Sequence, residues 1–310
     1  MDGDTFMILC AGEALIDMIP NADGAYVPHV GGAVLNTAVA LGRLDVPTGL
    51  VTGLSSDPFG HMIDAHLTTS HVDTSHAVRS NRNTTLAFVH LDGGNATYSF
   101  YDTETATSAI APADLPTVPA GTEAVFFGGI SLCNLPVADS LTNMALGVPA
   151  STLVMADPNI RPGFATDQAA YRARLERLIG RADIVKLSDD DISWLIPEGD
   201  LAAKSEALLA MGPKMLLLTE GSAGATALVK GGATVRVPAK RVEVVDTVGA
   251  GDTFNAGCLA ALRSAGALSP AAIPTLSEAV LTDMLTLAAR AAAVTVSRAG
   301  ANPPWTNELD

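Results

Sequence analysis

The sequence predicts an α/β protein built on a doubly wound, mainly parallel sheet. Short apolar runs recur along its 310 residues, at 6–12, 48–54, 123–129, 152–158, 183–188 and 215–221. Segments of helical periodicity separate several of them, as at 33–44 and 168–180. Near-continuous apolar strands that alternate with helices indicate a parallel sheet covered on both faces.

Two segments depart from that alternation. Residues 24–32 read as an extended insertion before the first helix, and residues 84–102 alternate apolar and polar side chains around Asp92-Gly93-Gly94, a strong hairpin signal. We expect one domain over 1–310, with a small β lid formed from about 13–30 and 84–103. For a chain of this length, the alternative to one domain is two modest domains. For the extra strands, the alternative to a lid is an extension of the sheet without that function.

Composition excludes several classes of protein. Hydrophobic residues make up 48% and charged residues 16%, and the formal net charge is −15, which disfavours nucleic acid and anionic membranes as partners. The first residues lack a basic region, and no run of about 18 uncharged apolar residues occurs. The three cysteines have apolar neighbours and are interpreted as reduced thiols, so we expect a cytoplasmic protein.

The stretch "VEVVDTVGAGDTF", residues 242–254, places a carboxylate at the start of a predicted helix. We expect a strand at 242–245, followed by a turn in which Gly249 and Gly251 expose backbone N–H groups to an anion. The helix dipole favours an ionised Asp252 there. A plain N-cap is the alternative role for Asp252. The sequence has no GxxxxGK[ST] loop, and Phe254 stands where a dinucleotide-binding GxGxxG motif needs its third glycine.

The whole string "DTVGAGDTF" (246–254) resembles the C-terminal signature of the ribokinase-like (PfkB) family of sugar kinases. "GGAVLNTAVALGRL" (31–44) is similar to the N-terminal signature of that family. The segments "DPNIR" (157–161), "KLSDDD" (186–191), "TEGSAG" (219–224) and "SRAGANPP" (297–304) occur in the family's order. The resemblance covers nearly the whole chain and implies an ATP-dependent phosphotransferase.

For the reaction centre, the resemblance implies that Asp252 is the catalytic base and that the backbone N–H groups of Gly249, Ala250 and Gly251 form an anion hole. It implies a sugar site that contains Asp17, Gly31, Gly32, Asn36, Asn159 and Arg161. Tyr101 is expected to pack on the sugar from the lid, and ordinary packing within the lid is the alternative.

For ATP, the resemblance implies binding by Lys186, Ser188, Thr219, Gly221, Gly224 and Gly251. Ser188 and Asp191 depart from the family's Asn and Glu in this segment, and the shorter Asp191 is expected to reach Mg²⁺ through water. Asp246 and the carbonyl group of Val248 are similar to a monovalent cation site, which implies potassium.

The motif combination looks most like bacterial fructokinases. Related kinases of 2-keto-3-deoxygluconate place an arginine after the aromatic pair, whereas Asp102 and Thr103 stand here and would repel a substrate carboxylate. A neutral hexose is therefore favoured. The alternatives are a 2-keto-3-deoxygluconate kinase, another ribokinase-like sugar or nucleoside kinase, and a catalytically silent sugar- or nucleotide-binding protein. An oxidoreductase is disfavoured by the missing dinucleotide motif. The lid strands predict a homodimer.

Overall fold

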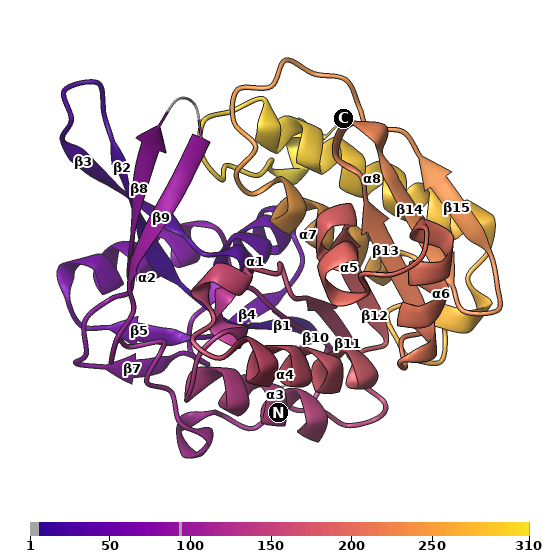
Figure 1. The fold of residues 1–310 in the computed structure, drawn as a ribbon, viewed down its shortest axis with the longest axis horizontal. Coiled ribbons are helices and arrows are strands. Elements are labelled where there is room, and N and C mark those ends of the chain that lie inside the picture. Colours follow the sequence, from indigo (N-terminus) through magenta and orange to yellow (C-terminus); the bar gives the residue numbers. More distant parts are fainter. Residues whose placement is uncertain (1–5, 93–94, 310) are drawn as a thin grey trace.

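A nine-stranded sheet forms the centre of the computed structural model, which describes residues 6–92 and 95–309 (Figure 1). The strand order is β15-β14-β13-β12-β11-β10-β1-β4-β6. The strands from β13 to β6 are parallel, and β14 and β15 add an antiparallel edge. The bounds are β1 Met7–Ala11, β4 Thr48–Val51, β6 Val72–Asp73, β10 Thr122–Gly128, β11 Leu153–Asp157, β12 Ile184–Ser188, β13 Met215–Thr219, β14 Ala225–Val229 and β15 Thr234–Val237.

Helices cover both faces of this sheet, as the doubly wound pattern predicts. They are α1 Ala33–Arg43, α2 Pro58–Thr69, α3 Val137–Gly147, α4 Gln168–Arg181, α5 Asp189–Leu195, α6 Leu201–Ala210, α7 Ala250–Ser264 and α8 Glu278–Val296. Short 3₁₀ turns are η1 Pro112–Asp114, η2 Ile130–Leu132, η3 Pro162–Phe164, η4 Gly221–Ala223, η5 Ile273–Thr275 and η6 Thr306–Glu308.

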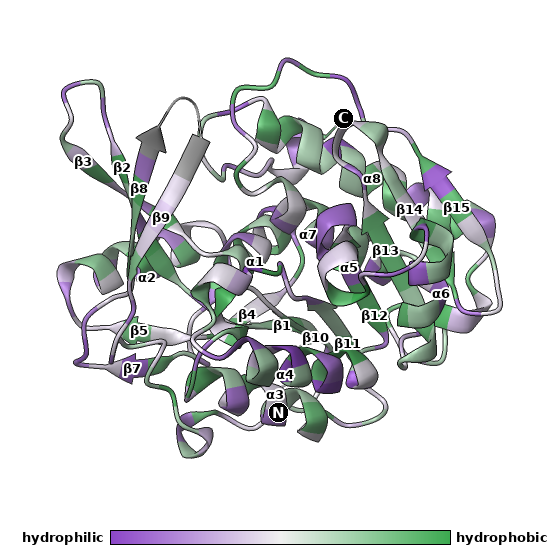
Figure 2. Cartoon of the chain, in the orientation of Figure 1, coloured by the Kyte–Doolittle hydropathy of each residue, from purple (hydrophilic) through white to green (hydrophobic). Residues whose placement is uncertain are grey.

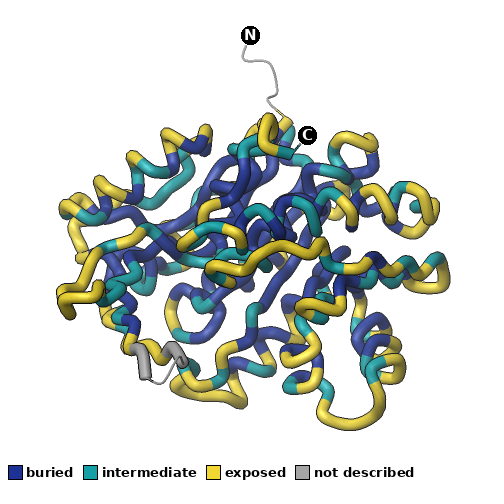
Figure 3. Tube along the Cα trace, turned by 90° about the horizontal axis from the view of Figure 1, so that it is seen from above, coloured by how far each residue is buried: buried dark blue, intermediate teal, exposed yellow. Residues whose placement is uncertain are grey.

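The side chains of each strand divide between two apolar cores. In β1, Ile8 and Cys10 pack with α1, α2, α7 and α8, whereas Leu9 and Ala11 pack with α3, α4, α5 and α6. The inner strands are apolar over most of their length, and the buried residues lie in the middle of the molecule (Figures 2 and 3). The predicted α/β fold class is therefore confirmed.

The two segments that broke the alternation form a separate four-stranded sheet in the order β3-β2-β8-β9. The strands are β2 Leu15–Pro20, β3 Tyr26–Gly31, β8 Leu86–Asp92 and β9 Asn95–Tyr101, and this sheet stands clear of the main body (Figure 1). Asp92 pairs with Asn95, so the predicted hairpin forms, while Gly93 and Gly94 of its turn lie outside the described residues. A two-stranded parallel sheet joins β5 Gly53–Ser55 to β7 Val78–Ser80.

One predicted strand is wrong. Residues 238–249 form an irregular segment that connects β15 to α7, and Val244 and Val245 within it are each 60% exposed. The backbone N–H of Val245 donates to the carbonyl oxygen of Val296 at 2.8 Å. The apolar run at 242–245 thus pairs with the end of α8 instead of joining the sheet.

α8 is the one helix in the described part of the chain that is long and apolar enough to cross a membrane, with a mean hydropathy of 1.5 over 18 residues. Its side chains Leu281, Met284 and Leu285 are fully buried in the core shared with α7. Core helices of folded domains meet the same criterion. The contact with α7 is close at Gly257, where a Cβ atom would lie 2.6 Å from the Cα atom of Ala288.

We expect Gly257→Ala to destabilise the fold by about 1–3 kcal/mol, because the added methyl group has to push two packed helices apart. Urea unfolding measures the change. Gly147→Ala is the matched control, since a Cβ atom at this helical glycine meets nothing within 4 Å. We expect the control to be neutral or stabilising by up to about 1 kcal/mol. Equal losses in both variants would show that the approach of α7 to α8 is not the cause.

Candidate active site

The N-terminus of α7 is held open by a glycine turn. Gly249 has a φ of 78°, a left-handed conformation in which other residues are strained, and no side chain caps the helix. A Cβ atom at Gly249 would also lie 2.8 Å from the Cβ atom of Ala301. The N–H of Ala250 donates to the carbonyl oxygen of Thr247 at 3.3 Å, whereas those of Gly249 and Gly251 have no partner among the described residues and are open to an anion.

Asp252 lies in the first turn of α7 and is only 8% exposed. The side-chain amide of Asn36, on α1, donates to its Oδ2 at 2.9 Å. Burial raises the pKa of Asp252 to about 7, although the hydrogen bond from Asn36 works in the opposite direction. With a pKa of about 7 the group changes its protonation near neutral pH, so it is not fully ionised there, whereas the helix dipole alone would predict a fully ionised group.

Four of the residues expected to form the sugar site lie where the small sheet joins α1. Asp17 is on β2, Gly31 ends β3, and a Cβ atom at Gly31 would overlap the Asp17 carboxylate. Gly32 has a φ of 111° and precedes α1, where a Cβ atom would lie 2.9 Å from the carbonyl oxygen of Glu13. Burial raises the pKa of Asp17 to about 6. Asn36 lies on the first turn of α1, where its N–H donates to the carbonyl oxygen of Gly32 at 2.8 Å and its side chain donates to Asp252.

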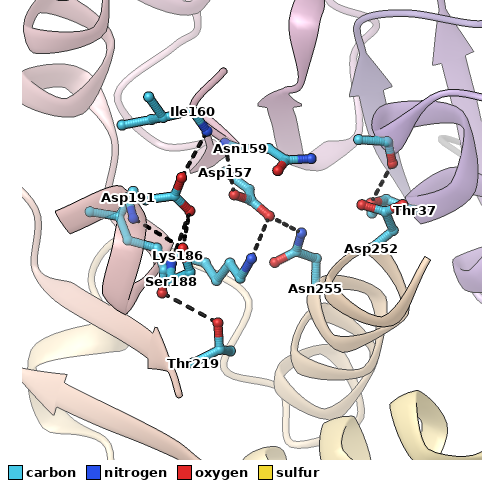
Figure 4. Close-up of polar contacts among 12 residues, drawn as sticks. Thr37, Asp157, Asn159, Ile160, Lys186, Ser188, Asp191, Thr219, Asp252 and Asn255 are labelled. Atoms are coloured by element: carbon cyan, nitrogen blue, oxygen red, sulfur yellow. Dashed lines mark hydrogen bonds and ion pairs between the residues drawn. The ribbon is translucent and has the colours of Figure 1, made fainter. Parts of the chain in front are cut away.

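Lys186 is part of a buried polar cluster that the sequence analysis did not assemble. Its Nζ atom lies 3.0 Å from Oδ2 of Asp157, at the end of β11. The amide of Asn255, on α7, donates to the same oxygen at 2.7 Å. Figure 4 shows this cluster on one side of the α7 terminus, with Asp252 on the other. Burial is the largest single effect and would lower the pKa of Lys186, but the charges of Asp157, Asp191 and Asp252 and the hydrogen bond to Asp157 together outweigh it, so the pKa is raised.

The Lys186 ammonium group lies directly behind the glycine turn, since a Cβ atom at Gly251 would be 3.2 Å from Nζ. The positive charge therefore lies beside the open N-terminus of α7. One polar atom of the cluster, Oδ1 of Asn255, is buried without a partner among the described residues. Asp157 begins the motif "DPNIR" and Asn255 directly follows "DTVGAGDTF", but their role around Lys186 depends on contacts between strands and helices far apart in sequence.

Asp191 braces two backbone segments. Its Oδ2 accepts hydrogen bonds from the backbone and hydroxyl groups of Ser188, and its Oδ1 accepts one from the backbone of Ile160 at 2.9 Å (Figure 4). Ser188 in turn caps α5. Both carboxylate oxygens of Asp191 thus already accept hydrogen bonds from the protein. Contact with a hydrated metal ion would use their remaining lone pairs.

The segment held by Asp191 carries two expected site residues. Asn159 has a φ of 44°, uncommon for a residue with a side chain, and its N–H donates to Asp157. Arg161 donates to the carbonyl oxygen of Ile160. A cavity of about 480 Å³ opens here, and its lining residues are Asn159, Ile160, Arg161, Pro162, Lys186, Ser188, Asp190, Asp191 and Trp194.

The expected nucleotide loop is a tight turn between β13 and β14. Thr219 ends β13, and its hydroxyl donates to the carbonyl oxygen of Leu187 at 3.4 Å. Gly221 and Gly224 have φ values of 52° and 110°. A Cβ atom at Gly221 would meet nothing within 4 Å, so the turn needs glycine there for its conformation and leaves open space above it.

Asp246 joins the glycine turn to the C-terminal loop. Its Oδ1 accepts from the N–H of Val248 at 3.0 Å, and its Oδ2 accepts from the N–H of Gly300 at 2.9 Å. No group of three or more His, Cys, Asp or Glu side chains suited to a metal lies within residues 6–92 and 95–309. A cation at Asp246 would therefore need backbone carbonyl oxygens, which are the ligands that the sequence analysis expected from Val248.

Tyr101 requires a correction. Asp17, Ala87 and Phe100 are aligned across β2, β8 and β9, so their side chains share a face of the small sheet. Tyr101 is the next residue and projects to the opposite face, where its ring lies 5.3 Å from that of Phe88, and it is 63% exposed. Side-chain alternation along β9 thus turns Tyr101 away from Asp17.

Glu13 is a buried residue that the sequence analysis passed over. Its carboxylate accepts from the N–H of Ala33 at 3.0 Å and from the hydroxyl of Ser131 at 2.8 Å. Burial raises its pKa, although these hydrogen bonds oppose the rise. It ties the start of α1 to the loop after β10. The sequence signal that could have identified Glu13 is an acidic residue inside the otherwise apolar run "AGEALI" (11–16).

Comparison with known proteins identifies the family. The model of the pfkB family of carbohydrate kinases matches residues 5–308. The chain belongs to this family. It is thus a carbohydrate kinase, a phosphotransferase that acts on a sugar hydroxyl group. The resemblance described from the sequence is confirmed.

Individual pfkB relatives are fructokinases. One from Rhizobium leguminosarum bv. trifolii is 43% identical over 279 residues, which cover 89% of this chain and 85% of the relative. The structure of fructokinase with bound ATP from Xylella fastidiosa has a TM-score of 0.90 at 28% identity, with 98% and 97% of the two chains covered. A double mutant of Vibrio cholerae O395 fructokinase, in fructose, ADP and potassium ion bound form, has a TM-score of 0.83 at 25% identity, with 96% and 95% covered.

We expect Lys186→Met to destabilise the fold by about 3–5 kcal/mol, because it leaves the buried Asp157 carboxylate without its cation. Lys214→Met is the matched control. Lys214 also pairs with an aspartate, Asp183, at 2.7 Å, but its side chain is 36% exposed and Arg181 remains near Asp183. We expect the control to lose less than about 1 kcal/mol. Urea unfolding of the ligand-free proteins compares the two, and similar losses would contradict the assignment of Lys186 to a buried pair.

Proposed function

We propose that this kinase transfers the γ-phosphate of ATP to a hydroxyl group of fructose, acting in the cytoplasm. The observation that carries the proposal is the position of Asp252, a buried carboxylate at an uncapped helix N-terminus that accepts a hydrogen bond from Asn36 in the helix beginning directly after the Gly31-Gly32 turn beside Asp17. A base for the sugar hydroxyl and donors for the phosphate thus lie within one helical turn. The fructokinase relatives support fructose as the acceptor.

In the proposed reaction, Asp17 and Asn36 orient the sugar so that one hydroxyl lies against Asp252. Asp252 accepts the proton of that hydroxyl as the hydroxyl oxygen bonds to the γ-phosphorus atom. The bond between this phosphorus atom and ADP breaks in the same step. The N–H groups of Gly249, Ala250 and Gly251 donate to the oxygens of the transferred group. Lys186, held behind the turn by Asp157 and Asn255, adds a fixed positive charge beside these donors.

The polyphosphate end of ATP needs further donors and a metal ion. Thr219, Gly221 and Gly224 line the open turn beyond β13, and Ser188 lies on the neighbouring strand. Mg²⁺ would neutralise charge on the phosphates, and Asp191 is the carboxylate placed to hold its water ligands. Asn159 and Arg161 line the same cavity as Ser188 and Asp191.

Potassium would bind beside the glycine turn, at Asp246 and the carbonyl oxygen of Val248. Asp246 already links this turn to Gly300, so a cation there would tighten the same contact. The potassium-bound fructokinase structure supports this part of the proposal.

A second copy of the chain would cover the outer face of the lid sheet. Tyr26, Phe88 and Tyr101 form an aromatic row on that face, and Tyr26 and Tyr101 are 39% and 63% exposed. Exposed aromatic rows on a sheet favour association. Light scattering at micromolar concentration measures the mass, and a monomer would contradict the proposed dimer.

The test of the proposed function is MgATP-dependent ADP formation with fructose, glucose, ribose, adenosine, 2-keto-3-deoxygluconate and fructose 6-phosphate, each with potassium or sodium as the added salt. We expect fructose to be preferred and potassium to be more effective than sodium. Preference for 2-keto-3-deoxygluconate would overturn the substrate and keep the kinase. Binding of ATP without turnover of any acceptor would favour a silent binding protein.

We expect Asp252→Asn to lower turnover by about a hundredfold or more, because the amide cannot accept the hydroxyl proton. The fold should persist, since a neutral amide costs less to bury than the charge that Asp252 carries above about pH 7. Thermal unfolding at pH 8 should therefore show a midpoint at or above that of the unaltered protein. Turnover within a few fold of the unaltered protein would remove Asp252 from this role.

We expect kcat/KM to fall as pH drops through about 7. The pKa of Asp252 is raised to about 7, so below that pH the carboxyl group is protonated and cannot accept a proton. Asn36→Ala removes the hydrogen bond that lowers this pKa, so its midpoint should shift to higher pH. Rate profiles from pH 5 to 9 on both proteins provide the measurement, and a midpoint near pH 4 would be inconsistent with a buried base.

A further inference from the structure

The last residues of the chain run from the glycine turn before α7 to the far end of α1. Residues 298–308 form this segment, the C-terminal strap. Near its beginning, the N–H of Gly300 donates to Asp246 at 2.9 Å. The next residue, Ala301, lies so close to Gly249 that a Cβ atom there would be 2.8 Å from its own. The strap therefore forms one wall of the glycine turn.

Further along, the strap is held by Arg43, the last residue of α1. Nη1 of Arg43 donates to Oδ1 of Asn302 at 2.7 Å and to the carbonyl oxygen of Pro303 at 2.8 Å. The ring of Trp305 lies over the guanidinium group, with its centroid 5.3 Å from Cζ. The hydroxyl of Thr306 donates back to the carbonyl oxygen of Arg43 at 3.3 Å. Four residues of the strap thus contact one arginine.

The residues held by Arg43 are adjacent to those that pack on the glycine turn. Asn302 directly follows Ala301, and its N–H donates to the carbonyl oxygen of Gly300 at 2.9 Å. Gly300, Ala301 and Asn302 thus form one compact turn. A displacement of Asn302 would carry the other two residues with it, and with them the wall beside Gly249.

α1 consequently contacts the reaction centre from both of its ends. At its first turn, Asn36 donates to Asp252 at 2.9 Å. At its last residue, Arg43 holds the strap that lies against the glycine turn. The residues of α1 from Val34 to Gly42 are buried, and a helix packed along its length moves as a unit. One rigid element thus contacts both the proton acceptor and the support of the anion-binding turn.

We propose that Arg43 is a positioning residue for phosphoryl transfer, which fixes the strap so that Gly300 and Ala301 hold the glycine turn in the geometry that the transferred phosphate requires. The inference rests on the proposed function, in which the N–H groups of that turn donate to the phosphate. Donors of this kind act mainly on charge that develops in the transition state, and small displacements weaken them. Loss of Arg43 should therefore lower turnover more than it weakens the binding of either substrate.

The test is Arg43→Met, which removes the guanidinium group and keeps an unbranched side chain. We expect kcat to fall about tenfold, while KM for the sugar and for ATP stays within about twofold. In the ligand-free protein, the amides of residues 298–304 should exchange hydrogen about tenfold faster, because the strap opens more often. Mass spectrometry of peptides from this segment measures the exchange, which is a readout independent of turnover.

The matched control is Arg181→Met. Arg181 is likewise the last residue of its helix, α4, and donates to the carbonyl oxygens of Val148 and Pro149. The loop that it holds precedes β11, whereas Asp157 of the site ends that strand, so the control lies at the opposite end of the sheet. We expect the control to leave kcat and the exchange of the strap unchanged.

A milder variant, Asn302→Ala, removes one acceptor of Arg43 from an exposed residue. Its kcat should fall about threefold, again without a change in KM. Combining Asn302→Ala with Arg43→Met should lower kcat no further than Arg43→Met alone, because both changes remove the same contact. If Arg43→Met does not fold by circular dichroism, Asn302→Ala decides, and an unchanged kcat there overturns the inference.

A lower kcat with unchanged KM values and faster exchange of the strap in Arg43→Met, but not in Arg181→Met, supports the inference. An unchanged kcat in Arg43→Met overturns it and leaves the proposed function standing. Equal falls of kcat in the two arginine variants also overturn it, because a general loss of stability would then be the cause. If the unaltered protein phosphorylates no sugar, the proposed function fails and the inference fails with it.

Discussion

The close approach of α7 to its neighbours determines where Asp252 lies. Gly257 lets α7 pack on the backbone of α8 at Ala288, and Gly249 lets the turn before α7 lie against Ala301. On the other side, Asn36 of α1 reaches Asp252 at 2.9 Å. These contacts bury a carboxylate at a helix N-terminus that no side chain caps. The open N–H groups and the proton acceptor are thus both products of core packing.

The buried carboxylates of the site differ in how many hydrogen bonds they accept from the protein. Asp157 accepts from Lys186, Asn255 and the backbone of Asn159, and Asp191 accepts from Ser188 and Ile160. Such groups hold backbone segments in place. Asp17 and Asp252 have raised pKa values of about 6 and 7 from burial. Asp17 and Asp252 are also the two acids that the proposed reaction uses, and perturbed pKa values are common among reactive groups.

Local patterns identified most of the fold, because buried strands and amphipathic helices leave short-range signals. They failed at 242–245, where an apolar run satisfies its backbone at Val296 in place of a strand. They also failed to orient Tyr101, although alternation along β9 contained the answer once the register with Ala87 and Asp17 was known. The family resemblance implied roles for Asp252, Asp17 and Asn36 but did not show the contacts of Asp157 with Lys186 and Asn255, since those contacts form only when distant strands and helices assemble.

Glu13 has a consequence for how this chain exchanges parts with its relatives. Its carboxylate fills the space that a Cβ atom would need at Gly129, which has a φ of 72°, and it also binds the start of α1. The two positions lie more than a hundred residues apart, yet a side chain at Gly129 would overlap the Glu13 carboxylate. A chimera that takes its first hundred residues from a homologue with a different acid or amide at the position of Glu13 places a different side chain against Gly129 and the start of α1. Recombination boundaries in this family should therefore keep both positions from one parent.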